Sequence, residues 1–536
     1  MTTTRSQDDV SGRTWRRNTA LFLVLSALVI GGLACARAEV PGPGGAGSGG
    51  VPPATVEPTE LSATAEAAIA AMTRVPSTAT PARPEPLASP TFPPTPTSAL
   101  TAADGDVPYA YEAQHGDTLR ALAVRFGVVP EEIVSPDGLL PTDGKMLDAG
   151  TILIIPRRLS SVGPAEKLLP DSEVVFSPHA ADFDVSGFAA SQGGYLNQYR
   201  EYVMGAWRRG PGVLAQAALD NSVNPRLLLA MLEYEAGWVT QSQIPTGDAL
   251  NYPLGFKDPL ERGLYRQLTW LANEIGKGYY GWRQGILTEL AFNDGSRLRL
   301  APDLNAGTVA LQHYFAQHHD ASDWSREISP NGVMGVYWRF FGNPMSYQHP
   351  LMEPGLEQPS MILPFLPGHV WSFTGGPHGA WERNAAWAAL DFAPGAMEPG
   401  CSTSEDWVVA VAPGVIVRSG LGLVVLDLDG DGNEQTGWNV LYLHVAGRGR
   451  VAAGTFVEQG DLLGHPSCEG GIATGTHVHL ARKYNGEWML ADGPVFFTLS
   501  GWAARAGTKP YQGALVRGDE IVLACPCGSR ETLITR

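Results

Sequence analysis

The sequence predicts a multidomain α+β protein with a small βααβ module, a mostly helical middle domain and a C-terminal antiparallel β domain. Three observations support this prediction. With 536 residues, the chain is too long for one hydrophobic core. Short β-branched and aromatic runs occur near both ends of the chain, and apolar residues recur at helical spacing between them. The 63 glycines and 42 prolines indicate many turns and linkers.

Composition divides the chain into segments. The stretch after the N-terminus is rich in Pro, Ala and Thr and can build little core, so we expect an extended linker there. The predicted boundaries are 1–35 for a signal peptide or lipoprotein signal or anchor, 36–106 for a disordered linker, 107–157 for the βααβ module, 158–188 for a linker, 189–345 for the helical domain, 346–358 for a connector and 359–536 for the β domain.

The N-terminus has the features of an export signal. Arginines precede an apolar run over 20–33, and small residues follow it. Leu33-Ala34-Cys35 also resembles the end of a bacterial lipoprotein signal, which implies lipidation of Cys35. A retained membrane anchor is the alternative, and each version predicts that the rest of the chain lies outside the cytoplasm.

The net charge of −17 narrows the possible partners. Such acidity argues against nucleic acid and offers no basic surface to anionic lipid. We therefore expect membrane contact only through the N-terminal anchor or a lipid.

The βααβ module begins with a strand over Tyr109–Ala113. Thr118 caps a helix that Gly127 ends, a short helix follows over Pro130–Val134, and a strand closes the module before Pro156. Three segments of this module resemble the lysin motif (LysM): Gly116-Asp117-Thr118-Leu119, Phe126-Gly127 and Leu153-Ile154-Ile155-Pro156. That resemblance implies binding of N-acetylglucosamine (GlcNAc) chains, with Gly116, Asp117, Thr118 and Leu119 at the sugar groove.

The middle domain has six amphipathic segments predicted as helices. They are Leu196–Trp207, Gly212–Asn221, Pro225–Glu235, Leu264–Gly276, Gly285–Phe292 and Gly307–His318.

Glu235 ends one of these helices beside aromatic residues, where a raised pKa would suit a general acid at a glycosidic oxygen. The segment resembles the catalytic helix of the lysozyme-like lytic transglycosylases, and Asn305-Ala306-Gly307 resembles their later turn. Ala236 stands where that family has serine, so a helical spacer or a binding domain is the alternative.

Histidines concentrate in the β domain, with five of the chain's twelve between 378 and 479. His477 and His479 alternate along a predicted strand and therefore share a face. The period of Trp438–His444 places His444 with Val440 and Tyr442 on one side of another strand.

Upstream of these strands, His378 lies in a glycine-rich turn and Asp391 interrupts an apolar run. A buried carboxylate needs a positive partner, which a metal ion supplies. Hydrolytic zinc takes three nitrogen or oxygen ligands and keeps one position for water.

Four segments resemble the lysostaphin-type zinc endopeptidases, most of all their staphylolysin or β-lytic branch. They are Gly376-Pro377-His378, Leu390-Asp391-Phe392, Leu441-Tyr442-Leu443-His444 and Gly475-Thr476-His477-Val478-His479. The resemblance implies Zn²⁺ held by His378, Asp391 and His479, with His444 and His477 as catalytic residues. Val478 replaces the more usual leucine.

Asp427, Asp429 and Asp431 begin a calcium-type loop with glycine at its sixth position. Trp438 stands at the twelfth position, where such loops have glutamate, so the predictions are a Ca²⁺ site or an acidic hairpin turn. Four cysteines besides Cys35 allow three pairings, of which we favour Cys401 with Cys468.

Together these features predict an exported zinc endopeptidase that hydrolyses peptide stems or crosslinks of peptidoglycan, brought to the cell wall by the LysM module. His444 or His477 would accept the proton of the attacking water. The alternatives are a noncatalytic wall-binding protein, an activator of another hydrolase, or a glycan-cleaving enzyme that uses Glu235.

Overall fold

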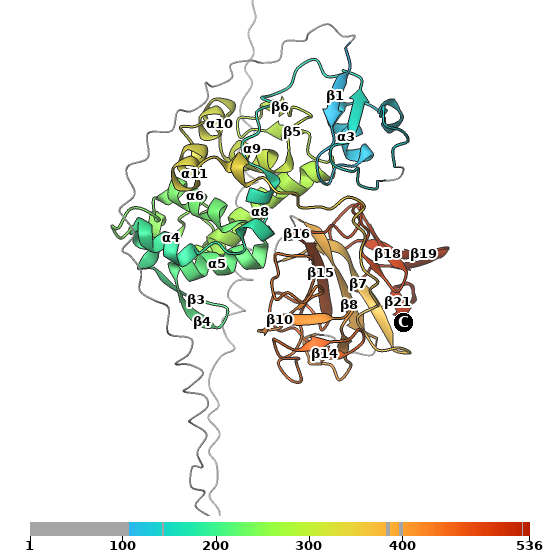
Figure 1. Ribbon diagram of the computed structural model, residues 1–536. Helices are drawn as coiled ribbons and strands as arrows, with labels where there is room; N and C mark the ends of the chain where they lie inside the picture. The colour runs from blue at the N-terminus through green and yellow to red at the C-terminus, as the bar shows by residue number, and fades with distance from the viewer. Residues whose placement is uncertain (1–106, 142–143, 382–385, 396–399, 528) are drawn as a thin grey trace, which may run out of the picture. The chain divides into compact units, whose positions relative to one another are not determined.

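A computed structural model describes residues 107–141, 144–381, 386–395, 400–527 and 529–536, all within one packing unit (Figure 1). The predicted signal at 1–35 and the predicted linker at 36–106 lie outside the described residues. None of the helices that the described residues form has the length and apolar composition needed to cross a membrane.

The N-terminal module has the predicted order of strand, helix, short helix and strand. Its elements are β1 (Tyr109–Glu112), α3 (Leu119–Phe126), η1 (Pro130–Glu132) and β2 (Ile152–Ile155). The two strands pair antiparallel, and the apolar face of α3 packs on them through Leu122 and Phe126, both buried. Thr118 caps α3 by accepting a hydrogen bond from the Ala121 N–H, 3.2 Å away.

The middle of the chain is mostly helical. Its helices are α4 (Val185–Gln192), α5 (Gly210–Asn221), α6 (Pro225–Ala236), α7 (Asp248–Asn251), α8 (Leu264–Arg283), α9 (Ala306–His318), α10 (Ala321–Glu327) and α11 (Val333–Phe341), with short turns η2 (Asp171–Glu173), η3 (Pro178–Ala180), η4 (Tyr195–Asn197), η5 (Pro259–Glu261) and η6 (Pro344–Tyr347). The segment 158–188, predicted as a linker, contains η2 and η3 and buries Leu169 and Val174 in the same core.

Two of the predicted helices are wrong. Leu196–Trp207 forms the hairpin of β3 (Arg200–Val203) and β4 (Ala206–Arg209), and Gly285–Phe292 contains β5 (Glu289–Ala291), which pairs with β6 (Arg297–Arg299). The β3–β4 turn places Met204 and Gly205 at φ angles of 49° and 75°, which no helix contains.

The C-terminal region is built on a nine-stranded antiparallel sheet, drawn from yellow to red in Figure 1. The strand order is β13 (Phe456–Val457), β10 (Gly414–Gly420), β11 (Leu423–Asp427), β12 (Trp438–Leu443), β15 (Val478–Tyr484), β8 (Trp387–Pro394), β7 (Val370–Gly379) and β21 (Leu533–Thr535), with β16 (Glu487–Trp488) beside β15. Smaller sheets join β9 (Val408–Val409) to β14 (Leu462–Gly464), and β17 (Thr498–Leu499), β18 (Trp502–Ala506), β19 (Gly513–Arg517) and β20 (Glu520–Leu523); η7 (Arg530–Thr532) precedes β21.

At β12 and β15 both faces of this sheet are covered, so every residue of the two strands is buried, including the polar Asn439, Arg482 and Lys483. Val440 and Tyr442 of β12 point into the core of the β region. Leu441 and Leu443 point the other way and share a core with the helices.

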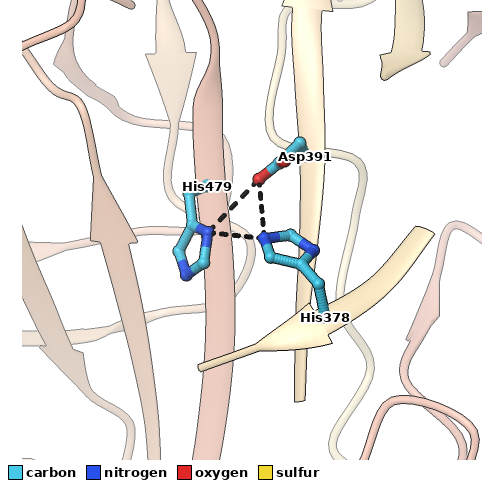
Figure 2. Close-up of side chains that lie close together, drawn as sticks. All are labelled: His378, Asp391 and His479. Atoms are coloured by element: carbon cyan, nitrogen blue, oxygen red, sulfur yellow. Dashed lines mark hydrogen bonds and ion pairs between the residues drawn. The ribbon is translucent and has the colours of Figure 1, made fainter. Parts of the chain in front are cut away.

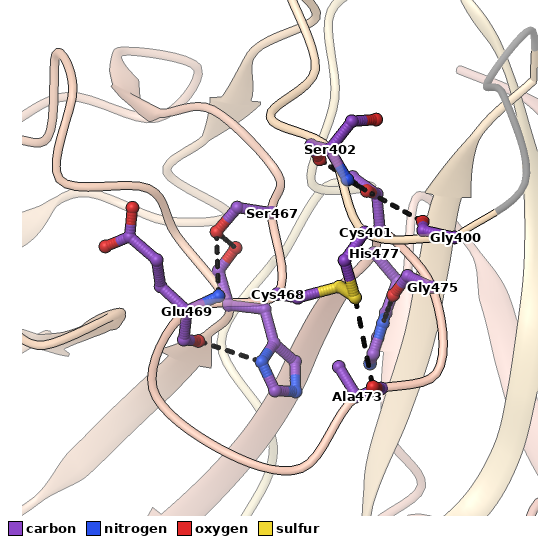
Figure 3. The surroundings of a disulfide bond; sticks show 11 residues. Gly400, Cys401, Ser402, Ser467, Cys468, Glu469, Ala473, Gly475 and His477 are labelled. Atoms are coloured by element: carbon purple, nitrogen blue, oxygen red, sulfur yellow. Dashed lines mark hydrogen bonds between the residues drawn. A yellow bond between two sulfur atoms is a disulfide. The ribbon is translucent and has the colours of Figure 1, made fainter. Parts of the chain in front are cut away.

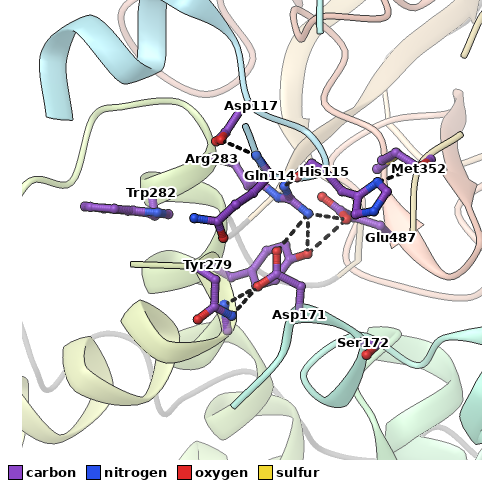
Figure 4. Close-up of polar contacts among 12 residues, drawn as sticks. Gln114, His115, Asp117, Asp171, Ser172, Tyr279, Trp282, Arg283, Met352 and Glu487 are labelled. Atoms are coloured by element: carbon purple, nitrogen blue, oxygen red, sulfur yellow. Dashed lines mark hydrogen bonds and ion pairs between the residues drawn. The ribbon is translucent and has the colours of Figure 1, made fainter. Parts of the chain in front are cut away.

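Buried charges between the regions are paired. Figure 4 shows the guanidinium of Arg283, at the end of α8, between two carboxylates: it lies 3.1 Å from Asp171 and 3.0 Å from Glu487 of β16. The same side chain donates to the carbonyl of His115 in the N-terminal module. These contacts compensate for the cost of burying the charges of Arg283 and Glu487.

Candidate metal centre

Three side chains that are far apart in the sequence converge on the face of the sheet opposite the β core (Figure 2). His378 Nε2 lies 3.0 Å from His479 Nδ1, and Asp391 Oδ1 lies 3.3 Å from the first nitrogen and 3.2 Å from the second. All three residues are buried, and Asp391 Oδ1 accepts no hydrogen bond. These are the three residues that the sequence predicts as zinc ligands.

The backbone explains this convergence. Asp391 on β8 lies directly opposite His479 on β15, so the two side chains share a face of the sheet. On the other side of β8, the register with β7 shifts around Gly375 and again before His378, which brings the histidine to the same place. A Cβ on Gly375 would lie 2.4 Å from Asp391 Oδ2, so only glycine leaves room for this carboxylate.

Backbone carbonyls fix the rings of four histidines. His378 Nδ1 lies 2.8 Å from the Gly376 oxygen, and His479 Nε2 lies 3.1 Å from the Ala380 oxygen. A carbonyl oxygen can only accept, so each of these nitrogens carries the proton and the nitrogen that faces Asp391 is bare in the neutral ring. His444 and His477 are held in the same way, at 2.9 Å from the Glu469 oxygen and 2.7 Å from the Gly475 oxygen.

The centre favours a positive charge. Burial opposes ionisation of Asp391, but His378 and His477 outweigh it and hold the pKa of this carboxyl well below its usual range. Burial lowers the pKa of His479, so this ring stays neutral. Burial opposes protonation of His378, but the Asp391 carboxylate outweighs it and raises the pKa of this ring. A positive charge beside the carboxylate is therefore favoured, and a bound cation would take the place of that proton.

His444 and His477 stand beside this cluster. Their ring centroids are 4.4 Å apart, and His477 Nε2 lies 3.7 Å from Asp391 Oδ1. The expectation that His444 shares a side with Val440 and Tyr442 is wrong: His444 has a φ of 67°, which ends the alternation of β12 and turns its ring to His477. Burial, followed by the charges of neighbouring histidines, lowers the pKa of His444 to about 3.

One aromatic residue at the centre was not anticipated from the sequence. The ring of Tyr511 stacks on His378 with a centroid distance of 4.1 Å, and its backbone N–H donates to the Pro377 carbonyl. Half of this side chain is exposed. Tyr511 stands 133 positions after His378 in the loop between β18 and β19, and no local pattern marks it.

A disulfide joins the loop between β8 and β9 to the loop between β14 and β15, which carries His477 (Figure 3). Cys401 is bonded to Cys468, as predicted, and a second bond joins Cys525 to Cys527. Next to Cys468, the Ser467 hydroxyl donates to the His444 carbonyl over 3.0 Å. On the other side, the Ser402 N–H donates to the Thr476 hydroxyl beside His477, also over 3.0 Å.

The other predicted sites lie apart from this centre. Glu235 ends α6 with part of its side chain exposed; surrounding protein and, less strongly, the Glu327 carboxylate raise its pKa to about 7. Asp427, Asp429 and Asp431 form a second group whose oxygen atoms lie within 4.8 Å of one another.

The predicted sugar-binding residues have mixed positions. Gly116, Thr118 and Leu119 line a cavity. Asp117 is buried and bonds to the Tyr111 hydroxyl at 2.6 Å and to Arg125 at 2.7 Å, so its carboxylate stabilises the module from inside.

Comparisons with known proteins find similarity over much of the chain. Residues 167–354 match the family described as "LasA, N-terminal domain". Protease LasA of Pseudomonas aeruginosa strain UCBPP-PA14 is 25% identical over 372 residues, which cover 64% of this chain and 79% of that protein. LasA of strain PAO1 is also 25% identical, over 373 residues.

Among solved structures, the M23 metalloprotease pseudoalterin has a TM-score of 0.28 and 25% identity, covering 33% of this chain and 99% of that one. The catalytic domain of lysostaphin from Staphylococcus simulans has a TM-score of 0.17 and 21% identity, covering 23% of this chain and 89% of that one.

Proposed function

We propose that this protein is a zinc-dependent endopeptidase that hydrolyses peptide bonds of bacterial peptidoglycan outside the cytoplasm. The observation that carries the proposal is the convergence of Asp391 Oδ1 with His378 Nε2 and His479 Nδ1, three lone-pair atoms separated by 3.0 to 3.3 Å. The sequence similarity to protease LasA supports the same reaction.

Zinc fits this donor set. A tetrahedral ion with bonds of about 2.0–2.1 Å separates its ligand atoms by about 3.3 Å. The three distances in the centre are close to this value. Two imidazoles and one carboxylate are also the ligand types of hydrolytic zinc sites, and the oxygen without a hydrogen bond on Asp391 has the partner it needs when the ion is bound.

Zinc, when bound there, supplies a Lewis acid that activates water and polarises a carbonyl group. His444 and His477 serve to accept and donate the proton of the attacking water. Since their Nδ1 atoms donate to backbone carbonyls, their Nε2 atoms are free to accept the proton of the attacking water, or to donate to the oxyanion once protonated. The low pKa of His444 keeps this ring neutral before the reaction.

We propose the cell wall as the substrate because the β domain resembles lysostaphin-type endopeptidases and the N-terminal module resembles the lysin motif. We propose that the module binds GlcNAc chains through Gly116, Thr118 and Leu119, which line a cavity. Binding of this kind raises the local concentration of the peptidase at the wall. Export through the N-terminal segment 1–35 is part of the same proposal.

The test is mass spectrometry of the fragments that the full-length protein releases from purified peptidoglycan. We expect new amino termini with the wild type and none with His378→Ala. His369→Ala is the matched control, because this histidine of the β domain pairs with Asp406 at the surface, away from the centre, and its variant should retain activity.

Two results would overturn the proposal. One is release of fragments by His378→Ala at the wild-type rate. The other is release of reducing or anhydro sugar ends without new amino termini, which would indicate glycan cleavage in place of peptide hydrolysis.

A further inference from the structure

The turn between β11 and β12 gathers three carboxylates on one side. Asp427, Asp429 and Asp431 alternate along it, and one oxygen of each lies within 4.8 Å of the others. Gly430 and Gly432, on either side of Asp431, have φ angles of 75° and 86°, so the backbone adopts a left-handed conformation twice in three residues. Acidic clusters are common on protein surfaces, and the buried end of this one distinguishes it.

Asp427, at the end of β11, is fully buried. Its Oδ2 accepts a hydrogen bond of 2.8 Å from the Gly432 N–H, across the turn. Its Oδ1 has no hydrogen-bond partner. A buried carboxylate oxygen without a partner is costly, because ionised groups lose strong interactions with water when they are buried.

A second buried oxygen without a partner lies opposite the first. Asn439 on β12 pairs directly with Asp427, which places the two side chains on one face with Cβ atoms about 4.5–5.5 Å apart. Asn439 is also fully buried. Its Nδ2 donates to the Thr436 carbonyl over 2.8 Å, while its Oδ1 has no hydrogen-bond partner.

Nearby basic side chains are engaged elsewhere. Arg418 lies 2.7 Å from Asp220, and Lys483 lies 3.1 Å from Glu434, which Arg418 also contacts. Among the residues that the structure describes, no lysine or arginine forms an ion pair with the three aspartates of the turn. Arg418 and Lys483 therefore do not neutralise the negative charge of the three aspartates.

We propose that Asp427, Asp429, Asp431 and Asn439 form a calcium site that fixes the β11–β12 turn. The site contains only carboxylate and amide oxygens, the ligands of hard cations, and lacks the nitrogen and sulfur ligands that zinc prefers. Trp438 occupies the twelfth position of the loop, where a glutamate would close an ordinary calcium loop. The amide oxygen of the next residue, Asn439, takes that place from the strand.

Calcium at this turn stabilises the sheet at a distance from the candidate metal centre. The turn also contains Glu434, whose carboxylate holds Lys483 of β15. It leads into β12, which ends one residue before His444 and pairs with β15 up to His479. Ordering the turn thus fixes one end of the two strands whose other ends carry histidines of the centre.

Terbium luminescence and calcium titration of the full-length protein test the proposal. The protein is freed of metal, supplied with one equivalent of zinc and titrated with Tb³⁺, whose emission Trp438 would sensitise from the start of β12. Ca²⁺ should then displace Tb³⁺ at micromolar to millimolar concentrations and raise the unfolding temperature. Mg²⁺ should displace it at least about 10-fold less effectively, because Mg²⁺ demands a smaller octahedral site.

The matched variants are Asp429→Asn and Asp461→Asn. Both aspartates are exposed in turns of the β region, so both variants should fold, and only Asp429→Asn should raise the half-saturating calcium concentration, by about 10-fold or more. Absence of calcium binding to the wild type up to about 10 mM, above the weakest class of extracellular sites, would overturn the proposal. Equal calcium binding by wild type and Asp429→Asn, or equal displacement by Mg²⁺, would also overturn it.

Discussion

Replacement of Asp391 by asparagine tests the metal centre most directly. Asparagine has nearly the same shape and keeps one oxygen, but it removes the charge that the two histidine nitrogens face at 3.2 and 3.3 Å. Loss of a residue that merely supports a metal ligand costs about 10- to 100-fold in affinity. Loss of the ligand's charge should therefore weaken zinc binding by at least about 100-fold.

This change in affinity sets the expected change in stability. At a free zinc concentration of about 100 times the wild-type dissociation constant, zinc stabilises the wild type by about 2.7 kcal/mol. A dissociation constant 100-fold higher makes the same concentration only half-saturating, which leaves about 0.4 kcal/mol. Zinc should thus raise the unfolding free energy of the wild type by about 2.3 kcal/mol more than that of Asp391→Asn.

Without zinc we expect the two proteins to differ by about 1 kcal/mol or less. The amide nitrogen of asparagine can donate to His378 Nε2 or His479 Nδ1, which replaces part of what the carboxylate contributes. The measurements are chelator competition for the zinc affinity and denaturant unfolding with and without zinc. Asp406→Asn is the control, because this aspartate pairs with His369 outside the centre.

The reasoning would be refuted by an unchanged zinc affinity in Asp391→Asn. It would also be refuted by an equal loss of stability in the presence and absence of zinc, since this is the behaviour of a residue with a purely structural role.

Three further predictions concern other parts of the chain. His444→Ala and His477→Ala should each retain zinc but lower peptide hydrolysis by about 10²- to 10⁴-fold, measured as turnover with the zinc content determined in parallel; loss of the metal would contradict this. Replacing Cys401 and Cys468 together by serine should reduce turnover while the zinc affinity stays within a few-fold of the wild type, because the residues next to the two cysteines contact His444 and Thr476, beside the proposed catalytic histidines, and not the proposed ligands. The pKa of Glu235 is raised by burial from 4.5 to about 7, so between these pH values the folded protein keeps a proton that the unfolded chain releases. The unfolding free energy should therefore fall as the pH rises from 4.5 to about 7, and the urea midpoints at about pH 5 and 8 should differ less in Glu235→Gln than in the wild type. An unchanged pH dependence in Glu235→Gln would be evidence against the raised pKa.

The strands that carry the candidate metal centre were predictable, because alternation along the sequence indicates a strand and apolar residues indicate that the strand is buried. An aspartate within Ala389–Phe392 and two histidines at alternate positions near 478 suffice to place side chains on sheet faces. The partners of those side chains were not predictable. The positions of the Gly376 and Ala380 carbonyl oxygens, which contact His378 and His479, depend on how β7 bulges. The stacking of Tyr511 on His378 depends on a loop far along the chain that folds back to the centre.

The helical region shows where periodicity fails as a guide. Leu196–Trp207 has apolar residues at helical spacing, but its centre is a two-residue turn at Met204-Gly205 and its flanks are aromatic or β-branched, as in Tyr202 and Val203. Between β5 and β6 the chain reverses over residues 292–296, where Gly295 has a φ of 83°. In each case the geometry of the turn determines the structure, and the turn signal was weaker than the apolar pattern around it.

Both proposed cation sites contain a buried carboxylate, and burying a carboxylate without a partner of opposite charge is costly. Elsewhere this protein pairs them with basic side chains: Glu487 with Arg283, and Glu434 with Arg418 and Lys483. Asp391 and Asp427 are buried to a similar degree, yet each has an oxygen to which no hydrogen bond is donated.

Since Glu487 and Glu434 are compensated by basic side chains, we expect Asp391 and Asp427 to be compensated as well, because a buried carboxylate costs several kcal/mol if it stays uncompensated. The neighbours of the two carboxylates then determine which ion compensates each of them. Imidazole nitrogens surround Asp391 and favour zinc, whereas oxygens surround Asp427 and favour calcium. The two ions should consequently be separable in experiment: Asp391→Asn should leave calcium binding intact, and Asp429→Asn should leave zinc binding intact.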